Sequence, residues 1–314
     1  MPITIITGGT GTIGKSLTKH LIELGHHLLI FTRNVESKTA TKHIDYKEWD
    51  PFRGIIDEGS ISQADYIINL AGAGVMDSSW TADYKKLILE SRTKSGLLLS
   101  ETISRVPNKI KAVISASAIG WYGEDRINLQ HSYGFIETDP PAKNFLGETC
   151  LLWEESVDGI LKNNIRLVKL RFGIVLSNDG GAYPEFVKSI KFGVASILGN
   201  GKQIVSWIHV EDLCRMISFS LENESVSGAY NAVGPEPIRN KELAIQIAQT
   251  MKGKFFVTLH VAKAILKLML GERSIEILKS TKVSCRKIKS AGFTFLYPNI
   301  NLAVEELVGS KDRL

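Results

Sequence analysis

Cysteine is scarce in this chain of 314 residues. The three that occur, Cys150, Cys214 and Cys285, lie far apart and form no C-x-x-C pair. An odd number without paired spacing argues against a structural zinc site and fits a reducing compartment. We therefore expect no metal site and a cytoplasmic location.

Long apolar runs and a strong charge of one sign are also missing. No run of about 18 apolar residues occurs, the length that suggests a membrane helix, and the apolar stretch 261–270 is short and contains lysine. The net charge is only +5, and the lysines are scattered rather than clustered with aromatic residues. We expect a soluble protein with neither a membrane nor a nucleic-acid partner.

Strand and helix patterns alternate through the first half of the chain. The alternation predicts a doubly wound α/β fold, in which helices cover both faces of a parallel sheet. Because the pattern changes after about residue 175, we expect one domain over 1–175, joined by a strand near 228–233, and a smaller, mixed α/β substrate lobe over 176–314. The expected strands are 3–6, 27–32, 65–70, 111–115 and 165–171, and the expected helices are 15–24, 82–105 and 145–162.

A glycine-rich turn joins the first strand to the first helix. Gly8 allows a sharp turn, Gly11 a close approach of the backbone to a pyrophosphate, and Gly14 tight helix packing. The phosphate would face free amides at a helix N-terminus, where the helix dipole favours negative charge. The turn predicts a dinucleotide site, and the alternative is an ordinary turn. It comprises Thr7, Gly8, Gly9, Thr10, Gly11, Thr12, Ile13 and Gly14.

The second strand ends at Thr32 and Arg33, where dinucleotide-binding domains often have an acidic residue. Arg33 can form paired hydrogen bonds with a 2′-phosphate, whereas a carboxylate at this point would repel one. The sequence therefore favours NADP(H) over NAD. The alternative is a solvated surface arginine.

The ordered set of motifs resembles the atypical, extended short-chain dehydrogenase/reductases, in the group called the NAD-dependent epimerase/dehydratase or epimerase family. The resemblance implies a Rossmann fold, a C-terminal lobe that supplies the pocket for a small-molecule substrate, and a monomer or homodimer. A segment of about 255–305 resembles the small C-terminal domain of this family. Besides the glycine turn, the matching segments are Thr32-Arg33, Asn69–Gly72, Glu90–Arg92, Ser115–Gly123, Phe145–Glu154, Arg171–Leu176 and Ser206–Leu213.

The resemblance also implies cofactor contacts beyond the glycine turn. Thr32 and Arg33 would meet the phosphate of the adenosine half. On physical grounds alone, a mid-helix arginine such as Arg92 is more often solvated or ion-paired. The other implied contacts are Leu70, Ala71, Gly72, Arg92, Ser115 and Ile174.

The proton relay typical of the superfamily is missing. Its active members use a Tyr-x-x-x-Lys pair, in which the lysine lowers the pKa of the tyrosine. None of the eight tyrosines in this chain has a lysine four residues later. Ser117 occupies the position of the superfamily's catalytic hydroxyl, and Tyr122 follows five residues later. We hypothesise that Tyr122 is an acid and Ser117 a hydrogen-bond donor; the alternative is that both merely line the pocket.

Two functions therefore stay open. The first is an NADP-dependent oxidoreductase or epimerase that acts on a small, sugar-like carbonyl or hydroxyl compound; the retained Ser117 and Tyr122 favour it. The second is a protein that binds NADP(H) without turnover, which the missing pair favours. Two further features are expected to be structural: His209 as a helix cap or a bridge between the lobes, and Trp153-Glu154 as helix packing.

Overall fold

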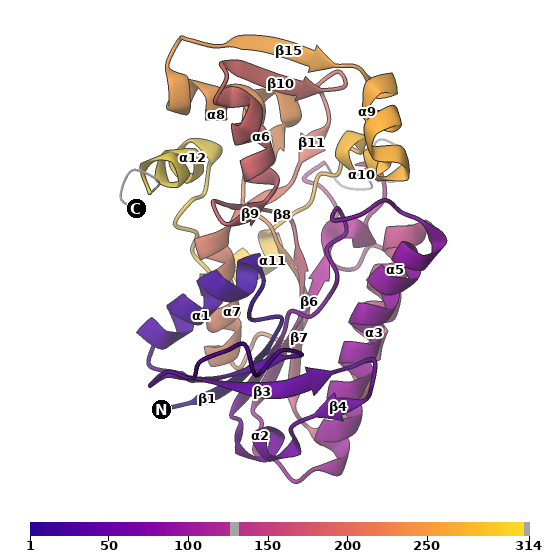
Figure 1. Cartoon of the computed structure of the whole chain (residues 1–314), viewed down its shortest axis with the longest axis vertical. Helices are drawn as coiled ribbons and strands as arrows, with labels where there is room; N and C mark the ends of the chain where they lie inside the picture. The colour runs from indigo at the N-terminus through magenta and orange to yellow at the C-terminus, as the bar shows by residue number, and fades with distance from the viewer. Residues whose placement is uncertain (126–131, 311–314) are drawn as a thin grey trace.

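Within residues 1–125 and 132–310, which the computed structural model describes, eight strands form one sheet (Figure 1). Its order is β13-β7-β6-β5-β1-β2-β3-β4, and every neighbouring pair is parallel except β3 and β4. The strand order reverses between β1 and β5, so the predicted doubly wound fold is confirmed. The strands are β1 (Ile3–Thr7), β2 (His27–Thr32), β3 (Ile44–Asp50), β4 (Ile55–Ile56), β5 (Tyr66–Asn69), β6 (Ala112–Ala118), β7 (Arg166–Phe172) and β13 (Gly228–Ala232).

Helices pack on both faces of this sheet. On one face, α1 buries Leu17 and Leu21 beside α7; on the other, α3 buries Leu99 and Ile103. Each pair is spaced by one helical turn, which places both side chains on the same side of the helix. The elements around the sheet are α1 (Thr12–Glu23), α2 (Glu58–Gln63), α3 (Ala82–Arg105), η1 (Ile119–Trp121), α5 (Phe145–Ser156), η2 (Asp158–Asn163), α7 (Val210–Glu222) and α11 (Arg286–Ser290).

Several elements of this half differ from the expected ones, since β3, β4, α2 and η1 were not predicted and one helix is shorter. The sequence did not predict β3, because four of its seven residues, IDYKEWD, are charged and the strand lies near the sheet edge, where such side chains reach solvent. The helix expected over 145–162 ends at Ser156 and gives way to η2. There the chain approaches α3 so closely that a Cβ on Gly159 would overlap the hydroxyl of Ser100.

A second, smaller unit lies beyond the carboxyl ends of the main strands (Figure 1, top). Its buried core comes mainly from α6, β10, α8 and α12. The unit is mixed α/β, as expected, since three short sheets are built into it beside the helices. Its elements are β8 (Ile174–Ser177), β9 (Gly180–Gly181), α6 (Ala182–Ile190), β10 (Val194–Leu198), β11 (Ile204–Val205), β12 (Trp207–His209), β14 (Ile238–Arg239), α8 (Asn240–Lys252), β15 (Val257–Val261), α9 (Lys263–Leu270), η3 (Gly271–Arg273), α10 (Ser274–Leu278) and α12 (Ile300–Gly309).

The chain passes between the two units repeatedly. Helix α7 follows the expected boundary at 175, yet it packs on α1, and β13 pairs with β7. Buried side chains from 283–295 also join the core on the α1 face of the large sheet. Segments that follow residue 175, including the returning strand expected near 228–233, therefore contribute to the core of the larger unit.

Candidate cofactor and active site

A cavity of about 500 Å³ opens at the carboxyl ends of β1, β2 and β5. In open α/β sheets, ligands bind at this edge, where the strand order reverses. The cavity is lined by Gly8, Thr10, Gly11, Phe31, Thr32, Arg33, Asn34, Ser37, Lys38, Trp49, Pro51, Phe52, Leu70, Ala71, Gly72, Ala73, Leu87, Ser91 and Ser95. Eight residues expected at the cofactor thus lie together here: Gly8, Thr10, Gly11, Thr32, Arg33, Leu70, Ala71 and Gly72.

The glycine turn forms the floor of this cavity. Gly8 has a φ of +69°, and a Cβ there would lie 2.7 Å from the carbonyl oxygen of Leu70, so only glycine fits. A Cβ on Gly14 would overlap the Gly8 carbonyl, which explains why α1 can begin so close to the turn. No side chain caps α1, and its first turn contains no acidic residue. Its N-terminus is therefore suited to an anion.

The loop after β2 contributes two cations to the cavity. Arg33 and Lys38 both line it, and none of the described residues in the lining is acidic. The loop is held by its own hydrogen bonds: Asn34 N donates to Thr32 Oγ1 over 3.3 Å, and Ser37 Oγ donates to the Asn34 carbonyl over 3.1 Å. The sequence motif predicts Arg33 but not Lys38, which lies five residues further along the loop at a position that no motif fixes.

Apolar side chains line another part of the same cavity. They belong to Trp49, Pro51 and Phe52, and Trp49 also contacts Phe31 with a ring separation of 5.7 Å. These residues were missed because β3, which carries Trp49, was not predicted. An aromatic and proline surface of this kind is suited to a flat, weakly polar ring.

Thr7 and Ser115 lie beneath the cavity rather than in its lining. The Thr7 hydroxyl donates to Asn69 Oδ1 over 2.7 Å and accepts from the Ala71 amide over 3.2 Å. The Asn69 side-chain amide donates to Ser115 Oγ over 3.4 Å. This buried chain of polar groups joins β1, β5 and β6, and holds the Leu70-Ala71 backbone in place.

Arg92 is neither solvated nor ion-paired. It is 9% exposed, and its Nη1 donates to the Ile88 carbonyl of its own helix over 2.8 Å. The guanidinium lies over the Trp153 ring at 4.9 Å and against Gly72. No described carboxylate pairs with it, and burial lowers its pKa. A buried cation without a counter-ion is costly, and it lies directly behind a residue of the cavity lining.

Four other expected cofactor residues have separate positions. Gly9 faces the Ile30 side chain, and Ile13 is half-buried in the core. Thr12 lies against Gly180 of β9, where the second unit meets the glycine turn. Ile174, 40% exposed, begins β8 rather than continuing a turn.

Ser117 and Tyr122 are enclosed in a polar network. Ser117 Oγ donates to Glu154 Oε1 over 2.7 Å, and the Tyr122 hydroxyl donates to Asn231 Oδ1 over 2.7 Å. Both residues are almost completely buried, and Tyr122 stacks on Phe135 with a ring separation of 5.0 Å. Burial raises the pKa of Tyr122 above its usual value. The geometry does not present either hydroxyl to the cavity and does not support the hypothesised proton transfer.

A buried ion pair forms the centre of this network. Arg171 of β7 binds Glu154 of α5 through two bonds, of 2.7 and 3.0 Å, and donates to the Tyr122 hydroxyl over 3.0 Å. Its guanidinium also lies 3.6 Å from the centre of the Trp121 ring. Glu154 is therefore more than the helix-packing residue expected, because it neutralises Arg171 inside the core. The ion pair was missed because α5 and β7 meet only in the folded chain.

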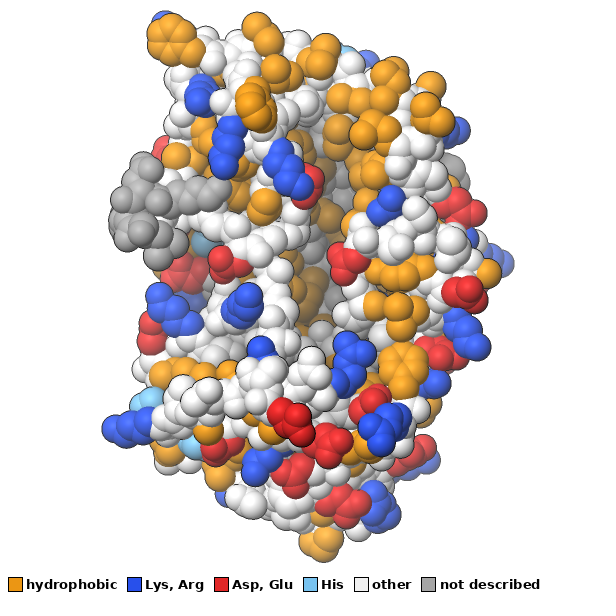
Figure 2. Space-filling model, viewed as in Figure 1, with side chains coloured by type: hydrophobic (Ala, Val, Ile, Leu, Met, Phe, Trp, Pro, Cys, Tyr) orange, Lys and Arg blue, Asp and Glu red, His pale blue; other side chains and the backbone are white. Residues whose placement is uncertain are grey.

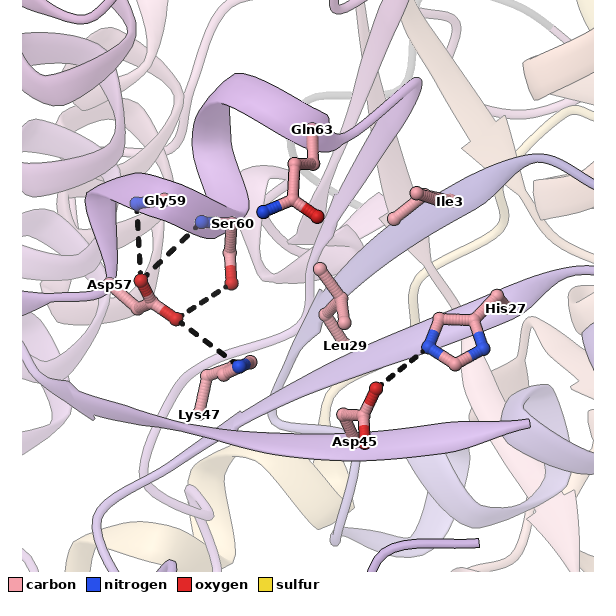
Figure 3. A pocket seen from close by; sticks show the side chains of 9 residues that line it. All are labelled: Ile3, His27, Leu29, Asp45, Lys47, Asp57, Gly59, Ser60 and Gln63. Atoms are coloured by element: carbon pink, nitrogen blue, oxygen red, sulfur yellow. Dashed lines mark hydrogen bonds and ion pairs between the residues drawn. The ribbon is translucent and has the colours of Figure 1, made fainter. Parts of the chain in front are cut away.

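A smaller cavity, of about 240 Å³, lies near the starts of β1 and β2, away from the glycine turn (Figure 3). Both carboxylates in its wall are already paired: Asp45 with His27 at 2.8 Å, and Asp57 with Lys47 at 3.8 Å. Asp57 also caps α2. These polar groups satisfy one another, so the larger cavity is the candidate cofactor site.

His209 caps the N-terminus of α7, which is one of the two structural roles expected for it. Its Nδ1 accepts from the Glu211 amide over 3.2 Å, and its ring lies 4.0 Å from that of Tyr297. The other ring nitrogen, Nε2, is buried without a hydrogen-bond partner among the described residues. Burial lowers the pKa of His209 to about 4. The residue is therefore a neutral structural group at pH 7.

The strand order, the glycine turn and the cavity define a Rossmann-type α/β protein of the short-chain dehydrogenase/reductase class. The chain belongs to the NAD dependent epimerase/dehydratase family, whose model matches residues 4–233, and a domain of unknown function (DUF1731) matches residues 261–307. Within the described residues, no helix has the length and apolar content to span a bilayer, and no group of His, Cys, Asp and Glu side chains is placed to hold a metal.

Similar proteins cover nearly the whole chain. Epimerase family protein YfhF of Bacillus subtilis is 34% identical over 307 residues, which is 98% of each chain. The crystal structure of human epimerase family protein SDR39U1 (isoform 2) with NADPH has a TM-score of 0.83 at 26% identity, and covers 98% of this chain and 99% of that one. UDP-N-acetylglucosamine 4-epimerase from Bacillus cereus, at 19% identity, has a TM-score of 0.77 over 100% of this chain and 98% of that one, and shares the fold.

Removing the charge of Glu154 should destabilise the protein. We expect Glu154→Gln to lower the free energy of unfolding by about 3 kcal/mol, because Arg171 keeps its buried charge without a counter-ion. The adjacent Glu155→Gln is the matched control, since Glu155 is exposed, and it should change stability by less than about 0.5 kcal/mol. Urea unfolding monitored by tryptophan fluorescence measures both. Equal stabilities of the two variants would contradict the role assigned to the pair.

His209 should make stability depend on pH. The pKa of His209 is lower in the folded chain than its usual value of 6.5. As the pH falls, His209 is therefore protonated in the unfolded chain before it is protonated in the folded chain, which favours unfolding. As the pH falls from about 6.5 to about 4, His209 should account for a loss of about 3 kcal/mol of unfolding free energy. His209→Asn retains a capping side chain and should not show this loss. Urea unfolding at half-unit pH steps measures the difference. Parallel pH profiles for the two proteins would sink this prediction.

Proposed function

We propose that the chain is an NADP(H)-dependent oxidoreductase of the epimerase family that acts on a small carbonyl or hydroxyl compound. One observation carries the cofactor assignment: Arg33 and Lys38 line a cavity that has no acidic residue among the described residues of its lining. A site for NAD usually presents a carboxylate to the ribose hydroxyl, whereas a phosphate at that position is bound by cations. The human relative crystallised with NADPH supports this choice.

The other lining residues fit the remaining parts of the same cofactor. The uncapped N-terminus of α1 would hold the pyrophosphate, and Trp49 and Phe52 would pack against the adenine. Arg92, a buried cation behind Gly72, would stabilise negative charge on that side of the site. When bound, NADPH supplies a hydride to a carbonyl carbon.

A second candidate is a protein that binds NADP(H) without turnover. One observation favours it: the hydroxyls of Ser117 and Tyr122 are used inside the protein, by Glu154 and Asn231. With no Tyr-x-x-x-Lys pair either, no side chain of the superfamily's relay is available to move a proton.

The cofactor assignment predicts a preference between nucleotides. We expect NADPH to bind at least tenfold more tightly than NADH, and Arg33→Ala to lose that preference while NADH affinity stays within about twofold, because only NADPH carries the 2′-phosphate. Lys38→Ala should weaken NADPH in the same way. Titration of nucleotide fluorescence measures each of these affinities.

Lys42→Ala is the matched control, since Lys42 is exposed on the same connection but does not line the cavity. It should leave both affinities unchanged. An equal loss of NADPH and NADH affinity in Arg33→Ala would contradict the phosphate contact. Absence of binding by either nucleotide would overturn the proposed function.

Turnover separates the two candidates. We expect the protein to oxidise NADPH in the presence of at least one compound from a panel of small aldehydes, ketones and sugar nucleotides. The decrease of the NADPH absorbance band measures the rate. Tyr122→Phe should retain the rate within about twofold, because the hydroxyl is enclosed. A loss of about a hundredfold at unchanged NADPH affinity would restore Tyr122 as the acid. No oxidation with any compound, despite tight NADPH binding, would favour the second candidate.

A further inference from the structure

The C-terminal part of the smaller unit presents an apolar and basic surface. In Figure 2, hydrophobic side chains gather over the upper right of the molecule, where Figure 1 places α9, and along its upper edge, where β15 lies. Several of these side chains protrude almost fully into solvent rather than line a groove. We call the set the apolar rim; it comprises Phe192, Phe255, Val257, Leu259, Ile265, Leu268 and Met269.

Two structural elements build the apolar rim. β15 pairs only with β10 among the described strands. Val257 and Leu259, two residues apart, point to the same face of β15. Phe255 and Phe192 flank one end of this small sheet, where the Val257 amide donates to the Gly193 carbonyl. α9 begins at the other end of β15, directly after Ala262.

α9 is amphipathic, but its apolar stripe faces solvent instead of the core. Ile265, Leu268 and Met269 are spaced i, i+3 and i+4, so they form one stripe, and they are 49%, 88% and 70% exposed. Leu266 is the buried contact of the helix with the protein. A helix that only covered the core would place its charged side chains, not this stripe, in solvent.

The charge of the segment is one-sided. From Ala244 to Gly271 the chain has no aspartate or glutamate, but it has Lys252, Lys254, Lys263 and Lys267. None of the four lysines forms an ion pair with a described residue, and the carboxylates that flank the segment, Glu242, Glu272 and Glu276, are paired with Arg239, Lys85 and Lys279. The surface is therefore positively charged as well as apolar.

We propose that the apolar rim and its lysines dock on an anionic lipid bilayer. Protruding apolar side chains beside unpaired lysines suit a surface in which apolar chains lie just below anionic headgroups. A second copy of this chain is disfavoured, because it would bring the same positive charge to the contact. The attachment is peripheral and does not depend on cofactor binding, and it replaces the sequence-based expectation that the protein has no membrane partner.

Vesicle sedimentation tests the proposal. The full-length protein should sediment with phosphatidylcholine vesicles that contain one-third phosphatidylglycerol, should stay in solution with phosphatidylcholine alone, and should be released by salt. Lys263→Gln with Lys267→Gln should weaken binding by about fivefold for each lysine. Leu268→Ser with Met269→Ser should weaken it by at least about tenfold, since two inserted apolar side chains are lost.

Leu161→Ser with Lys162→Gln is the matched control, because it removes an exposed leucine and a neighbouring lysine from η2 of the larger unit. It should bind as tightly as the unaltered chain. Thermal unfolding should show equal stability for all three variants, since every altered side chain is exposed. Failure to bind anionic vesicles, or equal binding by all the variants, overturns the proposal. So does a dimer, detected by sedimentation velocity, that only Leu268→Ser with Met269→Ser disrupts, because the rim would then be a contact between copies.

Discussion

The buried ion pair of Arg171 and Glu154 is the constraint around which the centre of the molecule is arranged. A charge in this position is tolerated only because it has a bidentate partner, an aromatic face beneath it and further acceptors around it. These contacts join β7 to α5, to η1 through Trp121, and to β13 through Tyr122 and Asn231. The hydroxyls of Ser117 and Tyr122 are thereby used in hydrogen bonds inside the protein.

The cofactor cavity depends on a different kind of constraint, the absence of side chains. Gly8 and Gly14 allow β1, α1 and the Leu70 segment to meet with no intervening atoms, and Gly11 leaves the turn open to the cavity. The network of Thr7, Asn69 and Ser115 then fixes the strands below. Arg33 and Lys38, in the loop after β2, line a cavity whose floor is formed by backbone atoms. The positive charge of the cavity and its shape therefore come from separate parts of the chain.

Much of this could be predicted from sequence, because it follows from local patterns. The glycine spacing located the floor of the cavity, and α3 begins and ends at Ala82 and Arg105, as the pattern indicated. The rest depends on contacts between distant segments. β3 carries too many charges to be identified alone, Lys38 has no motif to fix it, and the pairing of Glu154 with Arg171 requires α5 to lie across β7. Ser117 was predicted to be catalytic from its position at the end of a strand, but only the fold shows which group accepts the hydrogen bond from its hydroxyl.

The repeated passage of the chain between the two units has a consequence for how the protein folds. The backbone moves from one core to the other near residues 174, 210, 235, 281 and 298, so neither core is made from one continuous stretch. Each core needs segments that are synthesised after part of the other. Neither core can be completed before the later segments of the chain are present, and no single cut in the backbone releases either unit as an independent piece.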